Sequence, residues 1–273
     1  MDQKTEPGLA AIVAEILDAT ASHRSIPPFS SRPDGFGDED AARVAPLLRA
    51  AFEARGETIL GRKIGFTNPG IWAQYGVNAP NWGYVTDATT HELAATPSLR
   101  AADFPEPRIE PEIVFGLAAP LAPDMDDAAL IARIDWVALG YEIVQSPFPG
   151  WKFTPPDCIV VNTLHGALLI GARHAVAPRK AAWLAGLPAF TAELSCNGTV
   201  VERGGGASVL EGPLSTLRYL AALLARDADN PPLAAGEIVT TGTLTRAMPV
   251  SAGEAWTTAV SGIPLEAVTL RFA

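Results

Sequence analysis

The chain has 273 residues, of which 48% are hydrophobic and 18% are charged, which is too apolar for a disordered acidic protein. Its formal net charge is −10, and this argues against nucleic acid as the main partner because phosphate binding needs clustered Lys and Arg. With only two cysteines, Cys158 and Cys196, a disulfide framework and a four-thiolate zinc site are both excluded.

Two helices are predicted near the start of the chain. Residues 9–19 place their apolar side chains on one helical face. A turn-rich segment with three prolines follows over 25–37. Residues 38–56 begin with acidic residues and end on a glycine, as helices commonly do, and Pro46 is expected to kink or delay this helix.

The rest of the sequence predicts mainly short strands between turns, with three helices among them. These helices are expected over 126–134, 179–187 and 213–227, and the last has a proline in its first turn and a stripe of leucines. Residues 265–272 end in an alternation of apolar and polar side chains, which predicts a strand. Because strands and helices do not alternate regularly, the expected fold class is α+β.

The composition changes near residue 59, from helical to strand-rich. We therefore predict an N-terminal helical segment over 1–58 and a strand-rich domain over 59–273. No secretory signal is visible in the polar start, and the longest apolar stretch, 158–172, is too short to span a bilayer. The expectation is a soluble, cytoplasmic protein.

The segment RIEPEIVFGL, residues 108–117, carries the sharpest signal for chemistry. Glu110 and Glu112 are two residues apart in an extended segment, so both side chains project from one face. Pro111 between them cannot donate to a strand ladder, which predicts an edge strand or a bulge. A third carboxylate, Glu142, has apolar neighbours, among which an unpaired charge is costly.

Two interpretations of Glu142 are open at this point. It pairs with an arginine or faces solvent at a strand end, or it converges with Glu110 and Glu112 on a metal ion. Three carboxylates suit a hard divalent cation such as Mg²⁺ or Mn²⁺, with coordination positions left for water and substrate. Zinc is disfavoured because no cluster of Cys or His accompanies them.

Lys63 and His165 are further candidates. Lys63 lies between two glycines in GRKIGFTNPG; an isolated lysine is commonly a surface residue, but beside a metal-bound anion it would stabilise negative charge or relay a proton. His165 lies in an apolar run, where a hydrogen-bonded core histidine is the default and a catalytic role the alternative. Residues 240–246, TTGTLTR, could offer hydroxyl and backbone N–H groups to a carboxylate.

Four segments, taken in order, resemble one known family: 61–85, 108–117, 138–153 and 234–253. They are similar to the 2-keto-4-pentenoate hydratase / 2-oxo-acid decarboxylase group of the fumarylacetoacetate hydrolase superfamily. The resemblance implies a mixed β-roll with covering helices and an N-terminal helical segment, in which residues 59–273 form the catalytic domain.

The resemblance also implies a metal site and an active-site lysine. Mg²⁺ or Mn²⁺ would be held by Glu110, Glu112 and Glu142 and would bind the 1-carboxylate and 2-oxo (or 2-enol) oxygens of the substrate. Lys63 matches the active-site lysine of the family.

Other positions would contact the substrate, and some depart from the family pattern. Thr243 and Thr245 lie at the substrate-binding end of the family. Family hydratases usually have Asp where this chain has Asn81, and a small residue where it has Arg246. We hypothesise that Arg246 meets a distal carboxylate or another polar group of the substrate. We also hypothesise that His165 supplies a proton-transfer function that replaced residues nearby have lost.

The resemblance favours a lyase, namely a hydratase that adds water to an unsaturated 2-oxo (2-hydroxydienoic) acid during the catabolism of aromatic compounds. The alternatives are a decarboxylase of 2-oxo diacids, a C–C bond hydrolase, and a catalytically silent subunit. The expected partners are a small 2-oxo acid, further copies of the chain in a homo-oligomer, and an associated decarboxylase. Neither nucleic acid nor a membrane is expected as a partner.

Overall fold

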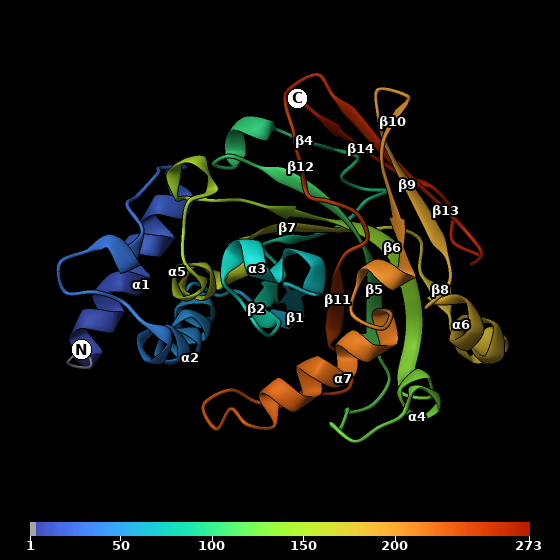
Figure 1. Ribbon diagram of the computed structural model, residues 1–273, viewed down its shortest axis with the longest axis horizontal. Helices are drawn as coiled ribbons and strands as arrows, with labels where there is room; N and C mark the ends of the chain where they lie inside the picture. The colour runs from blue at the N-terminus through green and yellow to red at the C-terminus, as the bar shows by residue number, and fades with distance from the viewer. Residues whose placement is uncertain (1–3) are drawn as a thin grey trace.

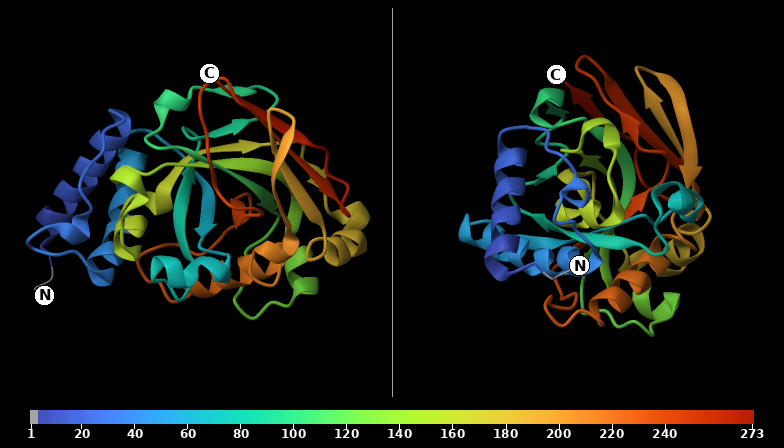
Figure 2. Two further views of the ribbon diagram at one scale, coloured as in Figure 1. Left: turned by 45° about the horizontal axis from the view of Figure 1, so that its top comes forward. Right: turned by 60° about the vertical axis from the view of Figure 1, so that its left-hand side comes forward.

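The computed structural model describes residues 4–273, which form two β-sheets surrounded by helices (Figure 1). The larger sheet has nine strands and the smaller sheet five. The N-terminal helices lie at one end of the molecule and the smaller sheet lies at the other (Figure 2).

The larger sheet is mixed, in the order β2-β1-β11-β5-β6-β7-β3, with β12 added to β5 and β8 added to β6. Strands β1 and β11 are parallel, whereas β5 is antiparallel to both of its neighbours, β11 and β6. The strands are β1 (Ile59–Gly65), β2 (Asn81–Thr86), β3 (Thr90–Glu92), β5 (Arg108–Leu117), β6 (Ile134–Val144), β7 (His165–Ile170), β8 (His174–Ala175), β11 (Ile238–Thr243) and β12 (Met248–Pro249).

The smaller sheet has the order β10-β9-β13-β14-β4 and shares a hydrophobic core with the larger one. Ile113 of β5 and Leu139 of β6 belong to the same buried cluster as Trp256 of β13 and Leu270 of β14. The strands of this sheet are β4 (Ser98–Leu99), β9 (Thr191–Cys196), β10 (Thr199–Gly205), β13 (Ala255–Ser261) and β14 (Val268–Phe272).

Three helices pack against this shared core: α4 (Asp127–Ile131), α6 (Lys180–Gly186) and α7 (Pro213–Leu224). Helix α7 begins with Pro213, whose fixed φ suits the first helical turn. Its leucines recur at helical spacing and bury one face of the helix in the core.

The N-terminal helices α1 (Glu6–Ala21) and α2 (Asp38–Ala54) belong to a second buried cluster. This cluster also includes Phe148 and Val160, and Val160 ends helix α5 (Pro155–Val160). The N-terminal helices therefore share their core with the segment that follows β6. The division into residues 1–58 and 59–273 stays a prediction.

Most of the elements predicted from the sequence are present. Helices α1, α2 and α7 confirm those predicted at 9–19, 38–56 and 213–227, and α2 continues through Pro46. Helix α4 is shorter than predicted because the segment turns into β6 at Ile134. Among residues 4–273, no helix combines the length and apolar character needed to cross a membrane.

Of the two alternatives predicted for Pro111, the edge strand was wrong, whereas an irregularity of the bulge type is present in the pairing of its strand. Strand β5 lies inside the larger sheet, between β11 and β6. The sheet accommodates Pro111 beside an irregularity, because the pairing of β11 with β5 shifts between Thr240 and Thr243. The Pro111 carbonyl then accepts a hydrogen bond from the backbone of Leu244 at 2.8 Å.

Candidate metal centre and substrate pocket

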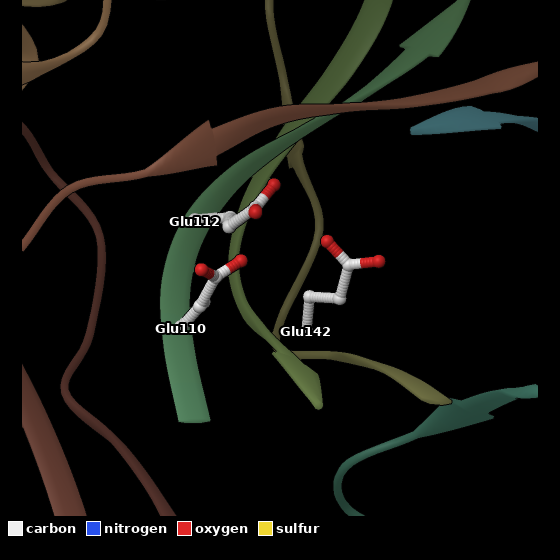
Figure 3. Close-up of side chains that lie close together, drawn as sticks. All are labelled: Glu110, Glu112 and Glu142. Atoms are coloured by element: carbon white, nitrogen blue, oxygen red, sulfur yellow. The ribbon is translucent and has the colours of Figure 1, made fainter. Parts of the chain in front are cut away.

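Three glutamates converge at the centre of the larger sheet. Glu110 and Glu112 project from the same face of β5, and Glu142 of β6 lies directly opposite Glu110 in the strand register. Figure 3 shows the three carboxylates pointing toward one another. One oxygen atom from each lies within 4.8 Å of the other two. Glu142 is fully buried, so the alternative in which it faces solvent is wrong.

The three carboxylates influence one another strongly. Burial raises the pKa of Glu110 to about 7, against the attraction of Lys63. Burial also raises the pKa of Glu112 well above its usual range, and the negative charges of Glu142 and Glu110 raise it further. Burial also acts to raise the pKa of Glu142. The positive charge of Lys63 and the hydrogen bond to His165 outweigh burial, so the pKa of Glu142 is lowered.

The carboxylate of Glu112 shows that this cluster fits a cation. Its Oε2 atom accepts a hydrogen bond from the backbone N–H of Gly242 at 2.9 Å. Its Oε1 atom is buried and has no hydrogen-bond partner. A buried charged oxygen without a partner is costly, and a divalent cation would supply the missing interaction. Three carboxylate ligands without any Cys or His match Mg²⁺ or Mn²⁺ better than zinc.

Gly242 is needed at its position for two reasons. Its φ angle is +87°, which favours glycine, and a Cβ atom there would lie 1.8 Å from Oγ1 of Thr67. The sequence predicted that the 240–246 segment offers backbone N–H groups to a carboxylate. The segment does so, although the carboxylate at Gly242 is that of Glu112.

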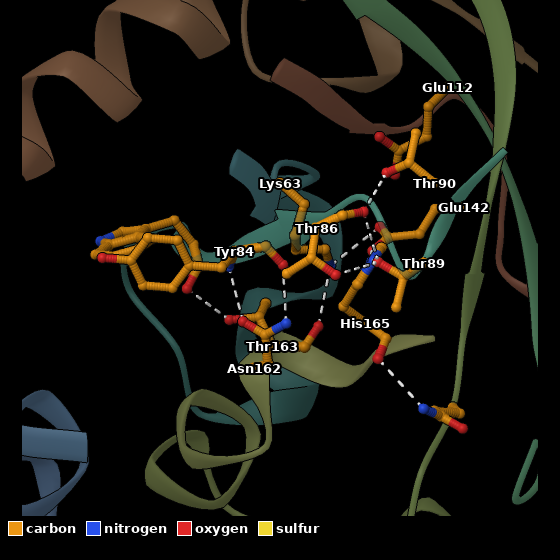
Figure 4. Close-up of polar contacts among 12 residues, drawn as sticks. Lys63, Tyr84, Thr86, Thr89, Thr90, Glu112, Glu142, Asn162, Thr163 and His165 are labelled. Atoms are coloured by element: carbon orange, nitrogen blue, oxygen red, sulfur yellow. Dashed lines mark hydrogen bonds and ion pairs between the residues drawn. The ribbon is translucent and has the colours of Figure 1, made fainter. Parts of the chain in front are cut away.

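Lys63 is a buried cation beside the carboxylates, not a surface lysine. Its Nζ atom lies 3.1 Å from Oε2 of Glu142 and donates to the carbonyl of Thr163 at 3.0 Å (Figure 4). Burial opposes its charge, but Glu142, Glu110 and Glu112 outweigh burial and raise its pKa. Lys63 therefore keeps its proton at neutral pH, as a fixed positive charge at the site.

The partner carbonyl of Lys63 comes from a constrained segment, residues 162–164. All three residues have φ between 53° and 62°, in the left-handed region. The Asn162 side chain holds this segment, because it accepts from the backbone N–H of Tyr84 at 2.7 Å and donates to its carbonyl at 2.9 Å. The roles of Asn162 and Thr163 were not predicted from the sequence. The one indication was that these two polar residues lie next to each other inside the apolar run 158–172.

His165 lies behind Glu142. Its Nδ1 atom lies 2.7 Å from Oε1 of Glu142, and its Nε2 atom lies 2.9 Å from Oγ1 of Thr89 (Figure 4). His165 does not line the cavity that contains Lys63 and Glu110. It lines a second cavity, of about 490 Å³, together with residues of α1 and α2. Thr89 was not expected from the sequence, since it lies 76 residues from His165.

The cavity beside the carboxylates, which we call the substrate pocket, has a volume of about 470 Å³. Its wall includes Lys63 and Glu110 at the metal end. Several aromatic side chains also line it: Phe66, Tyr75, Trp151 and Phe153. Tyr75 and Phe153 stack on each other with ring centroids 6.0 Å apart. The pocket therefore combines a charged end with an apolar body, as sites for small organic acids do.

The predicted substrate-binding residues are only partly brought together. Thr243, Thr245 and Arg246 line the pocket. The hydroxyl groups of the two threonines donate to the carbonyls of Thr245 and Arg246, so they stabilise their own turn. Arg246 pairs with Glu202 and its side chain is 76% exposed. Asn81 does not line the pocket; its amide donates to the thiol of Cys158 at 3.6 Å.

Comparison with known proteins relates the chain to enzymes that act on 2-oxo and 2-hydroxydienoic acids. No family model matches it. It is 30% identical to a 2-hydroxyhexa-2,4-dienoate hydratase from Comamonas testosteroni, over 91% of the chain and 92% of that protein.

Two solved structures define the fold relationship. A 4-oxalocrotonate decarboxylase from Pseudomonas putida G7, complexed with magnesium and adipate, superimposes with a TM-score of 0.88 at 29% identity, over 100% of both chains. A fumarylacetoacetate hydrolase family protein from Yersinia pestis CO92 matches with a TM-score of 0.54 over 80% of this chain and 94% of that one. At 15% identity, the second likeness shows the fold alone.

Proposed function

Because the chain belongs to the 2-keto-4-pentenoate hydratase / 2-oxo-acid decarboxylase family of the fumarylacetoacetate hydrolase superfamily, we propose that it is a divalent-metal-dependent hydro-lyase. It adds water to an unsaturated 2-oxo (2-hydroxydienoic) acid. The observation that carries this proposal is the group of three carboxylates, two of them fully buried, beside a buried lysine at one end of an apolar pocket.

Glu110, Glu112 and Glu142 would hold the cation, which we expect to be Mg²⁺ or Mn²⁺. When bound, the cation supplies positive charge that neutralises the enolate developing at the 2-oxo group of the substrate. The Gly242 N–H fixes one oxygen of Glu112, and His165 fixes one oxygen of Glu142. These two contacts keep the carboxylates in place, so the site needs little reorganisation during the reaction.

Lys63 holds a proton at Nζ where the substrate pocket meets the carboxylates. An ammonium group has three N–H bonds. Glu142 and the Thr163 carbonyl account for two of them, which leaves one for a substrate oxygen. Lys63 can therefore stabilise negative charge on that oxygen in the transition state.

The chain's other pocket residues orient the substrate. Conjugated 2-oxo acids are flat, and the rings of Phe66, Tyr75 and Phe153 give the pocket flat apolar surfaces. We propose that Thr243, Thr245 and Arg246 contact the far part of the substrate through the turn that they form. Asn81 would act indirectly, through Cys158, which lines the pocket.

The second candidate function is decarboxylation of a 2-oxo diacid. It is favoured by the similarity over the whole chain to a decarboxylase whose structure holds magnesium and adipate, which is itself a diacid. The same carboxylates and Lys63 would serve this reaction, because loss of CO₂ also passes through an enolate that positive charge stabilises. We propose that the chain works in the cytoplasm as a homo-oligomer, in a catabolic pathway, and that it associates with a partner decarboxylase.

The test is proton NMR of the purified protein with Mg²⁺ and three compounds: 2-hydroxypenta-2,4-dienoate, an unsaturated 2-oxo diacid and an acylpyruvate. The proposal predicts a new CH–OH signal at carbon 4 that EDTA abolishes. Loss of CO₂ would assign the second candidate, and cleavage of a C–C bond would assign a hydrolase. No metal-dependent change with any compound would contradict all three and favour a silent subunit.

A matched pair of variants links the reaction to the carboxylates. Glu112→Gln removes the charge from the buried carboxylate that lacks a partner for one oxygen. Glu193→Gln makes the same change at an exposed residue of β9, which pairs with Arg203. The proposal requires loss of product with the first variant and unchanged product with the second.

A further inference from the structure

The substrate pocket has a cationic group whose role the proposed reaction does not explain. Three positively charged side chains line it among the described residues: Lys63, Arg108 and Arg246. Lys63 pairs with Glu142, and Arg246 pairs with Glu202. Arg108 makes no ion pair and its guanidinium donates no hydrogen bond to protein within residues 4–273.

The position of Arg108 follows from the strand that carries the metal ligands. Positions 108, 110 and 112 alternate along β5, so the three side chains project from one face. A step of two residues along a strand covers about 7 Å, which places Arg108 one such step beyond Glu110. Its backbone is fixed on both sides, by pairing with Val144 of β6 and Pro249 of β12. Arg108 is therefore displaced from the metal end along the length of the pocket.

An aromatic ring holds the guanidinium group in place. The Cζ atom of Arg108 lies 3.9 Å from the centre of the Trp151 ring. Trp151 is itself anchored, because its indole N–H donates to the Glu106 carbonyl at 2.9 Å. This cation–π contact uses none of the N–H groups of the guanidinium, which therefore stay free to donate. A planar fork of donors of this kind matches a carboxylate, which it can bind through two parallel hydrogen bonds.

We infer that Arg108, held over the ring of Trp151, binds a second carboxylate at the distal end of the substrate, so that the enzyme prefers a 2-oxo diacid to a 2-oxo monoacid of equal length. The inference rests on the proposed function, in which the 1-carboxylate and 2-oxo group lie at the metal end. It assigns to Arg108 the recognition role that the sequence suggested for Arg246. The exposed guanidinium of Arg246 is instead paired with Glu202.

The experiment uses two saturated probes that differ only in the distal group, 2-oxoadipate and 2-oxohexanoate. Their dissociation constants are measured by isothermal titration calorimetry with Mg²⁺ present, so that the readout is binding and not turnover. We expect the wild-type protein to bind the diacid at least about tenfold more tightly, since a charge-assisted bidentate pair is worth about 10- to 100-fold in affinity. Arg108→Gln should remove this preference and leave the affinity for 2-oxohexanoate within about threefold.

Two further variants separate Arg108 from other sources of positive charge. Arg203→Gln removes an exposed charge on β10 and should leave the preference unchanged. If Arg246→Gln abolishes the preference while Arg108→Gln does not, the inference is overturned. Should Arg108→Gln fail to fold, Arg108→Lys decides, because lysine keeps the charge but loses the planar fork. An unchanged preference in Arg108→Lys would overturn the inference.

The results for the wild-type protein separate a failure of the role given to Arg108 from a failure of the proposed function. Equal, Mg²⁺-dependent binding of both probes would overturn the role of Arg108 and leave the proposed function standing. If neither probe binds with Mg²⁺, the proposed function fails, and the inference fails with it. A Mg²⁺-dependent preference for the diacid that disappears in Arg108→Gln supports both.

Discussion

The metal end of the substrate pocket and its outer rim are built from different parts of the fold. Glu112, Glu142 and Lys63 are at most 3% exposed and lie on β5, β6 and β1, inside the larger sheet. The rim is formed by the turn that follows β11 and by Trp151 and Phe153, and its Arg246 side chain is 76% exposed. The two regions meet in one cavity but differ in how their side chains are held.

Because of this difference, we expect the metal end to determine the rate of the reaction and the rim to determine which substrate is bound. At the metal end, strand register fixes the positions of the carboxylates, and the buried charges of Lys63 and Glu142 compensate each other. A change there removes more than one interaction. At the rim, side chains are held by local contacts such as that between Arg246 and Glu202, so they can change without disturbing the sheet. Substitutions at the metal end should therefore affect turnover, and those at the rim should affect the choice of substrate.

The largest effect is expected from Glu112→Gln. This change removes one of three carboxylate charges and leaves the cation with a weaker ligand. We expect turnover to fall by at least about a thousandfold, the upper range for loss of one preorganised electrostatic contact. The measurement is kcat at saturating Mg²⁺, with Glu193→Gln as the control. Activity within tenfold of wild type would contradict the assignment of Glu112.

Lys63→Met should reduce kcat by about 10²- to 10³-fold, because it removes the cation that faces the developing enolate. Metal binding should persist, since all three carboxylates remain. Comparing kcat with the Mn²⁺ dissociation constant separates the two effects. Lys152→Met, which changes a lysine outside the pocket lining, serves as the control. Normal turnover in Lys63→Met would show that the buried lysine is only structural.

The variant His165→Asn tests whether His165 acts by orienting Glu142 or by transferring a proton itself. The imidazole touches Glu142 but does not line the substrate pocket. We expect metal affinity to fall by about 10- to 100-fold, as for other changes to residues that orient metal ligands. At saturating metal, kcat should recover. A kcat that stays low at saturating metal would instead support the direct proton-transfer role that the sequence suggested.

The smallest expected effect is a change of Tm with pH in the metal-free protein. The pKa of Glu110 in the folded protein is about 7, above its ordinary value of 4.5, so protonation favours the folded state. Its contribution to the free energy of unfolding is fully present at low pH and is lost as the pH rises through about 7. The Tm of EDTA-treated protein should fall by about 2–4 °C between pH 6 and pH 8.

Excess Mg²⁺ should reduce this loss of Tm, because the cation replaces the proton as the partner of Glu110. Glu110→Gln should have a flatter dependence of Tm on pH, since it cannot ionise. Equal slopes in the wild-type protein and in this variant would show that another group is responsible.

The sequence predicted the cluster of three carboxylates better than its surroundings. Strand alternation alone placed Glu110 and Glu112 on one face, because that geometry is local. The position of Glu142 opposite Glu110 depends on strand register, so the residues alone left their convergence as one of two interpretations, and the family resemblance favoured it. For Pro111, the edge-strand alternative was wrong because the order of strands in a sheet is not a local property of the sequence, whereas the bulge alternative agrees with the shifted pairing of β11 with β5.

The residues that support the site were harder to predict. Thr89 meets His165 across 76 residues, and Thr163 meets Lys63 across 100 residues, so no local pattern connects these pairs. Arg108 is different, because it follows the same alternation as Glu110 and Glu112 and could have been found by extending that pattern by one step. The sequence places Arg246 directly after a threonine-rich segment, but no local pattern indicates that its side chain pairs with Glu202.

We propose that Glu110, Glu112 and Glu142 together form one catalytic metal site. The most direct test of this claim is an electron paramagnetic resonance titration of the metal-free protein with Mn²⁺, in the wild type and in Glu112→Gln. We predict one Mn²⁺ site per chain in the wild-type protein, displaced by Mg²⁺, and greatly weakened binding in the variant. Binding of equal affinity and number in both proteins would contradict the claim.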